Sequence, residues 1–397
     1  MKLLEALERG LADRDAAGLR RVRRTVLSPA GPRVNVDGRT LVAFASNDYL
    51  GLANHPQVVA AARAAASRWG VGAAASHLVC GHYAPHAALE EELAAWVQPC
   101  VGARALTFSS GYLANLAILT ALAGREDAIF ADRLNHACLN DGALLSRARL
   151  MRYRHGDLAS LRSRLAASRA RRKLIATDAV FSMDGDLAPL PALLALAEEV
   201  DAWLVIDDAH GFGVLGRDAD AGRGALAHFG LASERIVYMG TLGKAAGVAG
   251  AFVAAHPAVV ATIAETARMY VYTTAAPPLL AEALRASLAV IRCDRARHAH
   301  LAALIDRFRE RMRPLAWKLL PSTTPIQPVV VGDNASALAL AAQLQRLGFW
   351  VPAIRPPTVP AGSARLRVTL TAEHTHADVD ALADALAQLA PSCGVRR

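Results

Sequence analysis

Short apolar runs alternate with stretches of helical periodicity along the middle of the chain. The runs predict strands at 105–108, 128–131, 150–153, 173–177, 203–207, 235–239 and 249–253, and the periodic stretches predict helices at 113–122, 136–146, 158–167 and 191–200. Short buried strands that alternate with helices are typical of a mainly parallel sheet covered on both faces. We therefore expect an α/β fold with a seven-stranded sheet.

The N-terminal part follows other patterns. Residues 1–24 carry leucines at helical spacing between charged residues, which predicts an amphipathic arm that needs a surface to cover it, such as a partner subunit. Residues 34–42 predict a β-hairpin with an Asp-Gly turn. A helix is expected from Pro56 to just before Gly70, followed by a loop rich in Gly, Ala and Ser at 71–81.

The C-terminal part predicts a smaller α+β domain. A long helical stretch at 278–313 is expected to act as a hinge, followed by strands at 328–331, 349–351 and 366–370 and helices at 336–347 and 377–390. Three regions are thus predicted: a helical arm and hairpin at 1–47, a large cofactor-binding α/β domain at 48–283, and a C-terminal domain at 284–397.

Composition narrows the class of protein. The 397 residues are 53% hydrophobic, which suits a globular enzyme, and the longest uncharged run, 105–124, is interrupted by a Ser-Ser-Gly turn and does not resemble a membrane span. The net charge of +9 comes from scattered arginines, so solvated surfaces are favoured over nucleic-acid binding. Five dispersed cysteines without CxxC spacing, and an N-terminus without an apolar signal core, predict a cytoplasmic protein with no metal site.

Lys244 has the most unusual setting of the four lysines. It follows an apolar strand and a Gly-Thr-Leu-Gly bend and enters a stretch of Ala, Gly and Val without carboxylates. A buried, unpaired ammonium is costly and tends to lose its proton, and a neutral amine can form an imine with an aldehyde. The alternatives are a phosphate-binding lysine on a glycine loop and a solvated surface lysine.

Acidic residues follow another apolar strand. Asp207 ends the run 203–207, Asp208 follows it directly, and His210 comes two residues later. A carboxylate at such a strand end indicates a positive partner, a magnesium ion or a structural salt bridge. No GxxxxGK[ST] motif is present, and the segment 240–244 is too short to be one, which argues against nucleotide hydrolysis.

Pyridoxal phosphate accounts for these pieces together. Its aldehyde takes a lysine, its ring nitrogen needs a carboxylate, and its phosphate needs backbone N–H groups at a helix start. Lys244, Asp207 and the turn at 110–112 supply the three. His136 is a candidate platform over the ring, although such a histidine is more often a capping or core residue. No GxGxxG fingerprint follows any of the early strands, which argues against a dehydrogenase.

Four segments in order, 46–52, 180–186, 207–211 and 240–244, resemble the α-oxoamine synthases, pyridoxal phosphate (PLP) enzymes of fold type I. The resemblance covers essentially the whole chain. It implies that Lys244 carries the cofactor as a Schiff base and that Lys244, Asp207 and His136 are catalytic. It implies cofactor contacts by Gly111, Tyr112, His136, Ser182, Asp207, His210, Thr241, Lys244, Thr273 and Thr274, the last two reaching the phosphate of the other subunit of a homodimer. It implies substrate contacts by Arg20, Asn47, His136, Thr358 and Arg367.

The segments 326–334 and 353–360 narrow the resemblance to members that condense L-alanine with a pimeloyl thioester, carried by coenzyme A or acyl carrier protein, in biotin synthesis. Condensation of glycine with acetyl-CoA remains an alternative, as does a binding or scaffold protein without PLP. The chain departs from the family at His77, Ala179 and Phe212, where Arg, Gly and Thr are common, which leaves fine substrate contacts open. Nucleic acid and membrane are not expected as partners.

Overall fold

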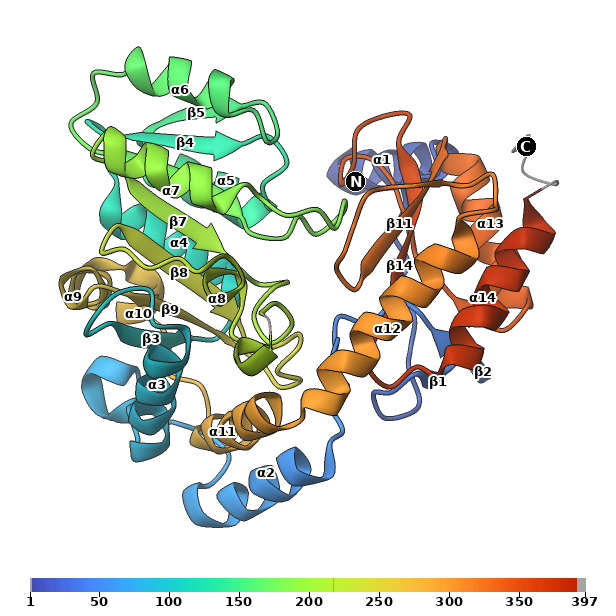
Figure 1. Cartoon of the computed structure of the whole chain (residues 1–397), viewed down its shortest axis with the longest axis horizontal. Coiled ribbons are helices and arrows are strands. Elements are labelled where there is room, and N and C mark those ends of the chain that lie inside the picture. The colour runs from blue at the N-terminus through green and yellow to red at the C-terminus, as the bar shows by residue number, and fades with distance from the viewer. Residues whose placement is uncertain (1, 217, 391–397) are drawn as a thin grey trace. The chain divides into compact units, whose positions relative to one another are not determined.

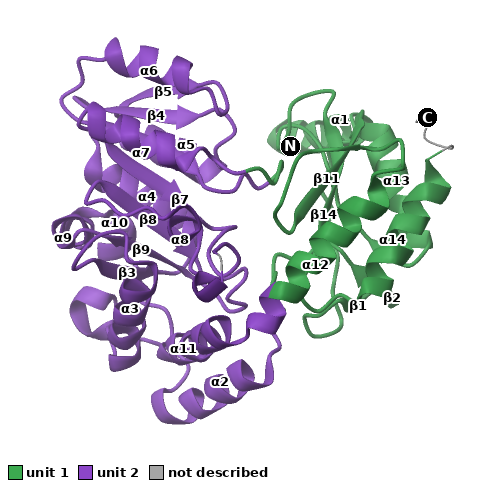
Figure 2. Ribbon diagram, viewed as in Figure 1, with its two compact units in different colours: residues 1–51, 183–186, 299–397 green, residues 52–182, 187–298 purple. Residues whose placement is uncertain are grey.

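The computed structural model describes residues 2–216 and 218–390, which form two compact units (Figure 2). Unit 1 comprises the residues up to Gly51, Met183–Asp186 and those from Ala299 on, and unit 2 comprises Leu52–Ser182 and Leu187–His298. The chain therefore passes between the units more than once. The predicted division into the regions 1–47, 48–283 and 284–397 stays a prediction.

Unit 2 is built on a seven-stranded sheet (Figure 1) with the strand order β3-β9-β8-β7-β6-β4-β5. The strands are β3 (Arg104–Phe108), β4 (Ala128–Asp132), β5 (Arg149–Tyr153), β6 (Lys173–Asp178), β7 (Trp203–Asp207), β8 (Ile236–Thr241) and β9 (Ala251–Ala255). Strands β5, β4, β6, β7 and β8 pair in parallel, whereas β9 is antiparallel to both β8 and β3. The predicted mainly parallel, seven-stranded sheet is confirmed.

The helices of unit 2 connect these strands. They are α2 (Pro56–Trp69), α3 (Ala84–Val97), α4 (Gly111–Leu122), α5 (Ala137–Leu145), α6 (Leu158–Ala166), α7 (Leu190–Glu199), α8 (Ala225–Phe229), α9 (Pro257–Thr266), α10 (Arg268–Val271) and α11 (Pro278–Cys293), with a π-helical turn η1 (His77–Gly81) and a 3₁₀ turn η2 (Asp218–Asp220). The turn η1 lies in the segment predicted to be a loop. The predicted helix from Pro56 to before Gly70 is confirmed as α2.

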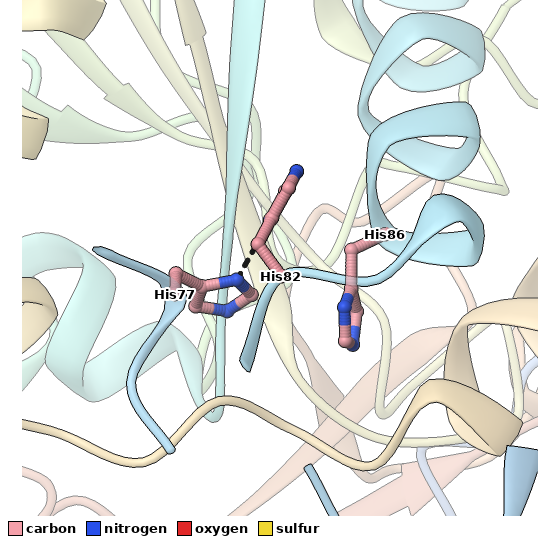
Figure 3. Close-up of side chains that lie close together, drawn as sticks. All are labelled: His77, His82 and His86. Atoms are coloured by element: carbon pink, nitrogen blue, oxygen red, sulfur yellow. Dashed lines mark hydrogen bonds between the residues drawn. The ribbon is translucent and has the colours of Figure 1, made fainter. Parts of the chain in front are cut away.

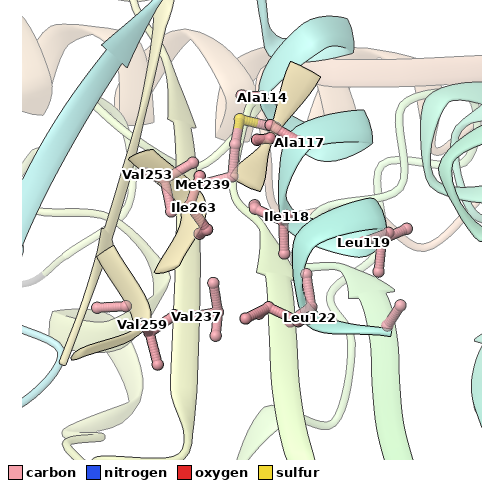
Figure 4. Packing of buried hydrophobic residues seen from close by; sticks show 14 of the residues in the cluster. Ala114, Ala117, Ile118, Leu119, Leu122, Val237, Met239, Val253, Val259 and Ile263 are labelled. Carbon is pink, nitrogen blue, oxygen red and sulfur yellow. The ribbon is translucent and has the colours of Figure 1, made fainter. Parts of the chain in front are cut away.

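Both faces of the sheet are buried. Successive residues of a strand point to opposite faces, and every residue of β8 and the last four of β7 are buried. On one face Val237 and Met239 of β8 and Val253 of β9 pack against Ile118 and Leu122 of α4 (Figure 4). A strand that is buried on both sides has no side chains facing solvent, so its sequence is a continuous run of apolar residues.

The prediction of one long helical stretch at 278–313 is wrong in one respect, because the structure has two helices there. Helix α11 ends at Cys293 and α12 (Arg295–Met312) begins after Asp294. The carboxylate of Asp294 accepts a hydrogen bond from the backbone N–H of Arg297 at 3.0 Å, so it caps the start of α12. Aspartate satisfies free N–H groups at a helix start, and here that preference divides the long apolar pattern.

Unit 1 contains the N-terminal helix, two small sheets and the C-terminal helices. Its elements are α1 (Lys2–Ala16), β1 (Arg33–Val36), β2 (Arg39–Ala43), β10 (Lys318–Leu319), β11 (Ile326–Gly332), α13 (Asn334–Arg346), β12 (Phe349–Trp350), β13 (Ala353–Ile354), β14 (Ala364–Thr369) and α14 (His376–Leu389), and most of α12 belongs to it. The predicted hairpin is confirmed as β1 and β2, and β2 also pairs with β12 in the same sheet, while the other sheet has the order β10-β11-β14-β13.

The segment Met183–Asp186 belongs to unit 1 although its neighbours in sequence belong to unit 2. Arg365 of β14 donates a hydrogen bond to the carboxylate of Asp184, and Ser322 donates one to the carbonyl oxygen of Gly185 at 2.9 Å. Gly185 has a φ of 75°, and a Cβ atom there would lie 2.5 Å from the carbonyl oxygen of Ile326. Glycine is therefore required at this position.

No helix among residues 2–216 and 218–390 is long and apolar enough to cross a membrane. Four cysteines in the same ranges, Cys80, Cys100, Cys138 and Cys293, are free thiols, and the fifth, Cys393, lies outside the described residues.

Candidate active site

A cavity of about 190 Å³ in unit 2 brings together most of the predicted cofactor residues. It lies at the carboxyl ends of β6, β7 and β8 and at the starts of α4 and α5, where a parallel sheet presents its ligand sites. Its lining residues are Gly111, Tyr112, His136, Cys138, Asp178, Asp207, Ala209, His210, Met239, Thr241 and Lys244. Seven of them were predicted from the sequence.

Lys244 lies in the turn that follows β8, and its amine points to a histidine. Its Nζ atom is 2.8 Å from Nε2 of His210, and the lysine is half-buried. The amine therefore has a polar partner, although no carboxylate lies near it in the sequence. The carboxylate-free sequence around Lys244 could not reveal this partner, because His210 comes from the loop after β7, 34 residues earlier.

Asp207 ends β7 and is 3% exposed. Its Oδ2 atom accepts a hydrogen bond from the side-chain amide of Asn115 at 2.6 Å, and its Oδ1 atom accepts one from the backbone N–H of Ala209 at 2.9 Å. Among the described residues, no arginine or lysine forms an ion pair with it. The carboxylate is thus fixed by neutral donors, and the cavity can offer its charge to a cationic ligand.

His136 directly precedes α5. Its backbone N–H donates a hydrogen bond to Oδ2 of Asp178 at 2.8 Å. Its ring atom Nδ1 accepts the backbone N–H of Cys138 at 3.3 Å and lies 2.8 Å from the Cys138 sulfur. Burial lowers the pKa of His136, the carboxylate of Asp207 raises it, and the amine of Lys244 lowers it further, with a net lowering. The neutral ring is therefore favoured.

Asp178, Cys138 and Asn115 are site residues that the sequence analysis missed. Burial and the nearby carboxylate of Asp207 raise the pKa of Asp178 well above its usual range. Burial also raises the pKa of the Cys138 thiol, and the carboxylate of Asp207 adds to the effect, so the thiol stays protonated. Asp178 ends β6 as Asp207 ends β7, and this repeated position was the signal that could have identified it.

The start of α4 supplies backbone donors at the cavity. Ser110 caps the helix by accepting the N–H of Leu113 at 3.3 Å, and Gly111 and Tyr112 follow in the first turn. The Tyr112 hydroxyl donates to the carboxylate of Asp141, which raises the pKa of Tyr112. Thr241 at the end of β8 donates its hydroxyl to the carbonyl oxygen of Gly250 at 3.1 Å. A helix start with such neighbours is suited to binding a phosphate.

Three predicted cofactor residues of unit 2 do not line this cavity. Ser182 is half-buried directly after Phe181, and Thr273 and Thr274 lie in the segment between α10 and α11. Thr273 is half-buried and Thr274 is exposed. The structure therefore does not bring these side chains together with Lys244 and Asp207 in one chain's cavity.

The predicted substrate residues of unit 1 fall into two groups. In the first, Arg367 of β14 is 6% exposed, and its Nη1 atom donates to the side-chain oxygen of Asn47 at 3.1 Å. The same oxygen accepts the hydroxyl of Tyr49 at 3.1 Å. The Nη2 atom of Arg367 also lies 3.5 Å from the Tyr49 hydroxyl, and a guanidinium fork of this kind can bind a carboxylate.

The second group surrounds the end of the N-terminal arm. Arg20 lines a cavity of about 440 Å³ together with Arg24 and Arg355, and it donates to the carboxylate of Asp15. The hydroxyl of Thr358 accepts a hydrogen bond from Arg21 at 3.0 Å. Arg355 donates to the backbone carbonyl of Gly18, which holds this part of the arm within unit 1.

Sequence comparisons place the chain in a family. The aminotransferase class I and II family matches residues 39–386. An 8-amino-7-oxononanoate synthase from Aromatoleum aromaticum is 59% identical over 387 residues, which cover 98% of this chain and 99% of that protein. A protein of the same name from an Azoarcus species is 60% identical over 388 residues, which cover 98% of both chains.

Solved structures agree with this placement. A solved structure of a serine palmitoyltransferase (SPT) with PLP internal aldimine has a TM-score of 0.89 and is 26% identical to this chain. The match covers 99% of this chain and 96% of that one. The crystal structure of 8-amino-7-oxononanoate synthase from Francisella tularensis has a TM-score of 0.77 and 29% identity and covers 89% of this chain and 98% of its own. The fold is thus the fold type I expected from the sequence. The chain belongs to the aminotransferase class I and II family and, within it, to the 8-amino-7-oxononanoate synthases.

Proposed function

We propose that this chain condenses L-alanine with a pimeloyl thioester, using pyridoxal 5'-phosphate, to give 8-amino-7-oxononanoate, carbon dioxide and the free thiol carrier, a step of biotin synthesis. The observation that carries this proposal is the identity of 59% and 60% to two synthases of that name over nearly the whole chain. Such identity over the full length makes a shared reaction the simplest interpretation, and the residues of the cavity suit it.

The residues of the cavity fit this cofactor. Asp207 is buried with neutral donors and no cationic partner among the described residues, so its carboxylate suits a protonated ring nitrogen. The start of α4, with Gly111 and Tyr112, suits a phosphate, with Thr241 beside it. His136 would lie against the ring, while Ser182 and His210 would hold its phenolic side. Lys244 would carry the cofactor covalently.

When bound, the cofactor supplies an electron sink that makes the Cα–H bond of an amino acid acidic. Residues of this chain would accept the Cα proton and position its acceptor. With alanine and the cofactor bound, the Nζ atom of Lys244 would accept the Cα proton as general base. His210 Nε2, 2.8 Å from that atom, orients the amine by a hydrogen bond. Asp207 would hold a proton on the ring nitrogen of the cofactor, and His136, favoured in its neutral form, would give the site a flat, uncharged surface.

We further propose that Arg367 and Asn47 bind the carboxylate of alanine. Arg367 is buried, and its contact with Asn47 joins residues 320 positions apart, so the two are held in one place before substrate arrives. A guanidinium fork matches a carboxylate in geometry and charge.

Arg20 and Thr358 are proposed to bind the acyl substrate. Three arginines line the cavity at the arm, which suits a carboxylate, its ester or the phosphates of a thiol carrier. The side chain of Arg20 is 47% exposed and already contacts Asp15, so its contribution is smaller than that of a fully desolvated pair. Coenzyme A and acyl carrier protein remain alternatives as carrier.

The test is a side-by-side assay of L-alanine with pimeloyl-CoA and of glycine with acetyl-CoA, on the wild type and on Arg20→Ala. We expect the first pair to be preferred, and the variant to lose pimeloyl use by about tenfold with little change in cofactor binding. A preference for glycine and acetyl-CoA would assign the chain to the sibling reaction. A purified protein that never takes up PLP, judged by its visible absorbance, would indicate a binding protein instead.

A homodimer and a cytoplasmic location are also proposed. Helix α1 has no buried residue, and Leu3, Leu4 and Leu7 are 75%, 62% and 58% exposed in the single chain. A second copy would cover this apolar face, and it would give Thr273 and Thr274 the partner's cofactor to contact. Sedimentation of a fully active monomer would contradict the dimer.

A further inference from the structure

Three histidines of unit 2 converge on one point outside the cofactor cavity. His77 begins the turn η1, His82 follows that turn, and His86 lies in the first turn of α3 (Figure 3). One ring nitrogen from each lies within 4.8 Å of the other two, and the Nδ1 atoms of His77 and His82 are 2.9 Å apart. None of the three lines the cavity that contains Lys244.

We propose that His77, His82 and His86 form a binding site for a divalent transition-metal ion of the zinc class. Imidazole nitrogen is a preferred ligand of Zn²⁺, and the spacing His-x₄-His-x₃-His falls within the range common in zinc sites. Cysteine spacing had predicted no metal site, and it could not detect one made of histidines alone.

His86 already makes the kind of hydrogen bond that a metal-binding histidine makes with its second nitrogen, and a carboxylate lies near His82. A histidine ligand usually donates its second ring N–H to a carboxylate or carbonyl, which fixes the ring. The Nε2 atom of His82 lies 3.9 Å from Oε2 of Glu90, on the side of the ring away from His77. The Nε2 atom of His86 lies 2.8 Å from the carbonyl oxygen of Ala276. His77 stacks on Tyr270 with ring centres 5.2 Å apart and an interplanar angle of 5°.

Glu90 is itself fixed as a partner of this kind. It is 9% exposed, and its Oε1 atom accepts hydrogen bonds from the backbone N–H and the hydroxyl of Thr107 at 2.7 and 2.8 Å. Its Oε2 atom is left to face His82.

One of the three rings is accessible. Burial lowers the pKa of all three rings, and for His77 burial together with the neighbouring rings of His86 and His82 lowers the pKa to about 4. Neutral imidazoles keep the lone pair that a metal needs. His82 is exposed and lines a surface cavity of about 510 Å³, which gives an ion a route to the rings.

Binding requires small local movements. Zn–N bonds of about 2.0 to 2.1 Å in a tetrahedron place ligand nitrogens roughly 3.3 Å apart, closer than the 4.8 Å limit here. His86 also accepts the N–H of Tyr83 on Nδ1 at 3.0 Å, and it would exchange this hydrogen bond for the metal if it ligates through that atom. The bound ion would tie η1 to the start of α3.

The test uses the untagged holoenzyme and Zn²⁺, followed by calorimetric titration and by elemental analysis after dialysis. Co²⁺ serves as a spectroscopic probe, because its visible bands report tetrahedral nitrogen ligation. The variants are His82→Gln, whose side chain is exposed, and Glu90→Gln, which keeps an oxygen for Thr107. The matched control is His376→Gln, which removes an exposed histidine of unit 1.

We expect one Zn²⁺ per chain in the wild type and the control, with a higher melting temperature when Zn²⁺ is present. His82→Gln should weaken binding by at least about tenfold and remove the Co²⁺ bands, and Glu90→Gln should weaken it by about tenfold. A wild type without stoichiometric binding would overturn the proposal. Undiminished binding by His82→Gln, with a change in the cofactor's own absorbance, would place the ion at the PLP site and would also overturn it.

Discussion

The cofactor cavity of unit 2 and the arginine sites of unit 1 assemble polar groups in two different ways. In unit 2, the acidic residues Asp178 and Asp207 end neighbouring parallel strands, and Lys244 follows the next strand, β8. In unit 1, hydrogen bonds join residues far apart in the chain, such as Arg367 with Asn47, 320 positions apart, and Arg21 with Thr358, 337 positions apart.

The difference has a physical cause. Parallel strands deliver their carboxyl ends to one edge of a sheet, so a strand pattern alone predicts which polar residues meet there. No such rule brings the N-terminal arm to the loops of the C-terminal domain, where the contacts depend on how the small sheets pack. Cofactor chemistry is therefore expected to depend on unit 2, and substrate affinity on unit 1. Four predictions test this comparison.

The largest effect is expected at Lys244. Lys244→Ala removes the amine that holds the cofactor and takes the Cα proton, so turnover should fall below detection and borohydride should no longer fix the cofactor to the chain. The measurement is mass spectrometry after reduction, together with a product assay. A cofactor adduct on another lysine with retained activity would contradict the assignment.

Asp207→Asn tests the second residue of the same cavity. An amide cannot hold the proton on the ring nitrogen, so exchange of the alanine Cα proton with solvent should slow by about a hundredfold or more, while the cofactor still binds. Asp207→Glu, which keeps the charge, should be milder. Exchange at the wild-type rate in the Asn variant would remove Asp207 from the mechanism.

Arg367→Lys tests the carboxylate site of unit 1. The substitution keeps a positive charge but loses the planar fork, so the KM for alanine should rise by about tenfold or more, with a smaller change in kcat. Arg346→Ala, at an exposed arginine of the same unit, should leave both constants unchanged. A loss confined to kcat would mean that Arg367 acts in the chemical step, and the comparison between the units would fail.

The smallest effect concerns stability and involves His374 of unit 1. This histidine is 1% exposed, stacks on Phe44 and accepts the N–H of Thr371 on Nδ1 at 3.0 Å. Burial lowers its pKa from 6.5 to about 4. The unfolded chain therefore takes up this proton first as the pH falls, so the stability that the neutral ring provides is present above about 6.5 and is lost toward pH 4.

The loss amounts to roughly 3 kcal/mol at most, since each pKa unit corresponds to about 1.4 kcal/mol. Denaturant unfolding at several pH values is the measurement. His374→Gln should be less stable at neutral pH but should show a weaker pH dependence between about 6.5 and 4. His376→Gln, an exposed neighbour, should behave as the wild type. Equal pH dependence in all three proteins would rule out His374 as the titrating group.

The sequence by itself determined the seven-stranded sheet and the place of the chemistry. Strands buried on both faces must be continuously apolar, so the polar residues that end them, such as Asp207, stand out in the sequence. The carboxylate-free setting among small residues identified Lys244 after β8, and the turn before a helix identified Gly111.

Only the tertiary structure decided which side chains touch. Asn115 reaches Asp207 across 92 positions, His210 reaches the amine of Lys244, and Glu90 faces His82 while Thr107 holds it. These contacts depend on how a helix lies against a strand or how a loop turns back. Local pattern carries no information about such distances, since hydrogen bonding acts over about 3 Å and joins residues that the chain separates widely.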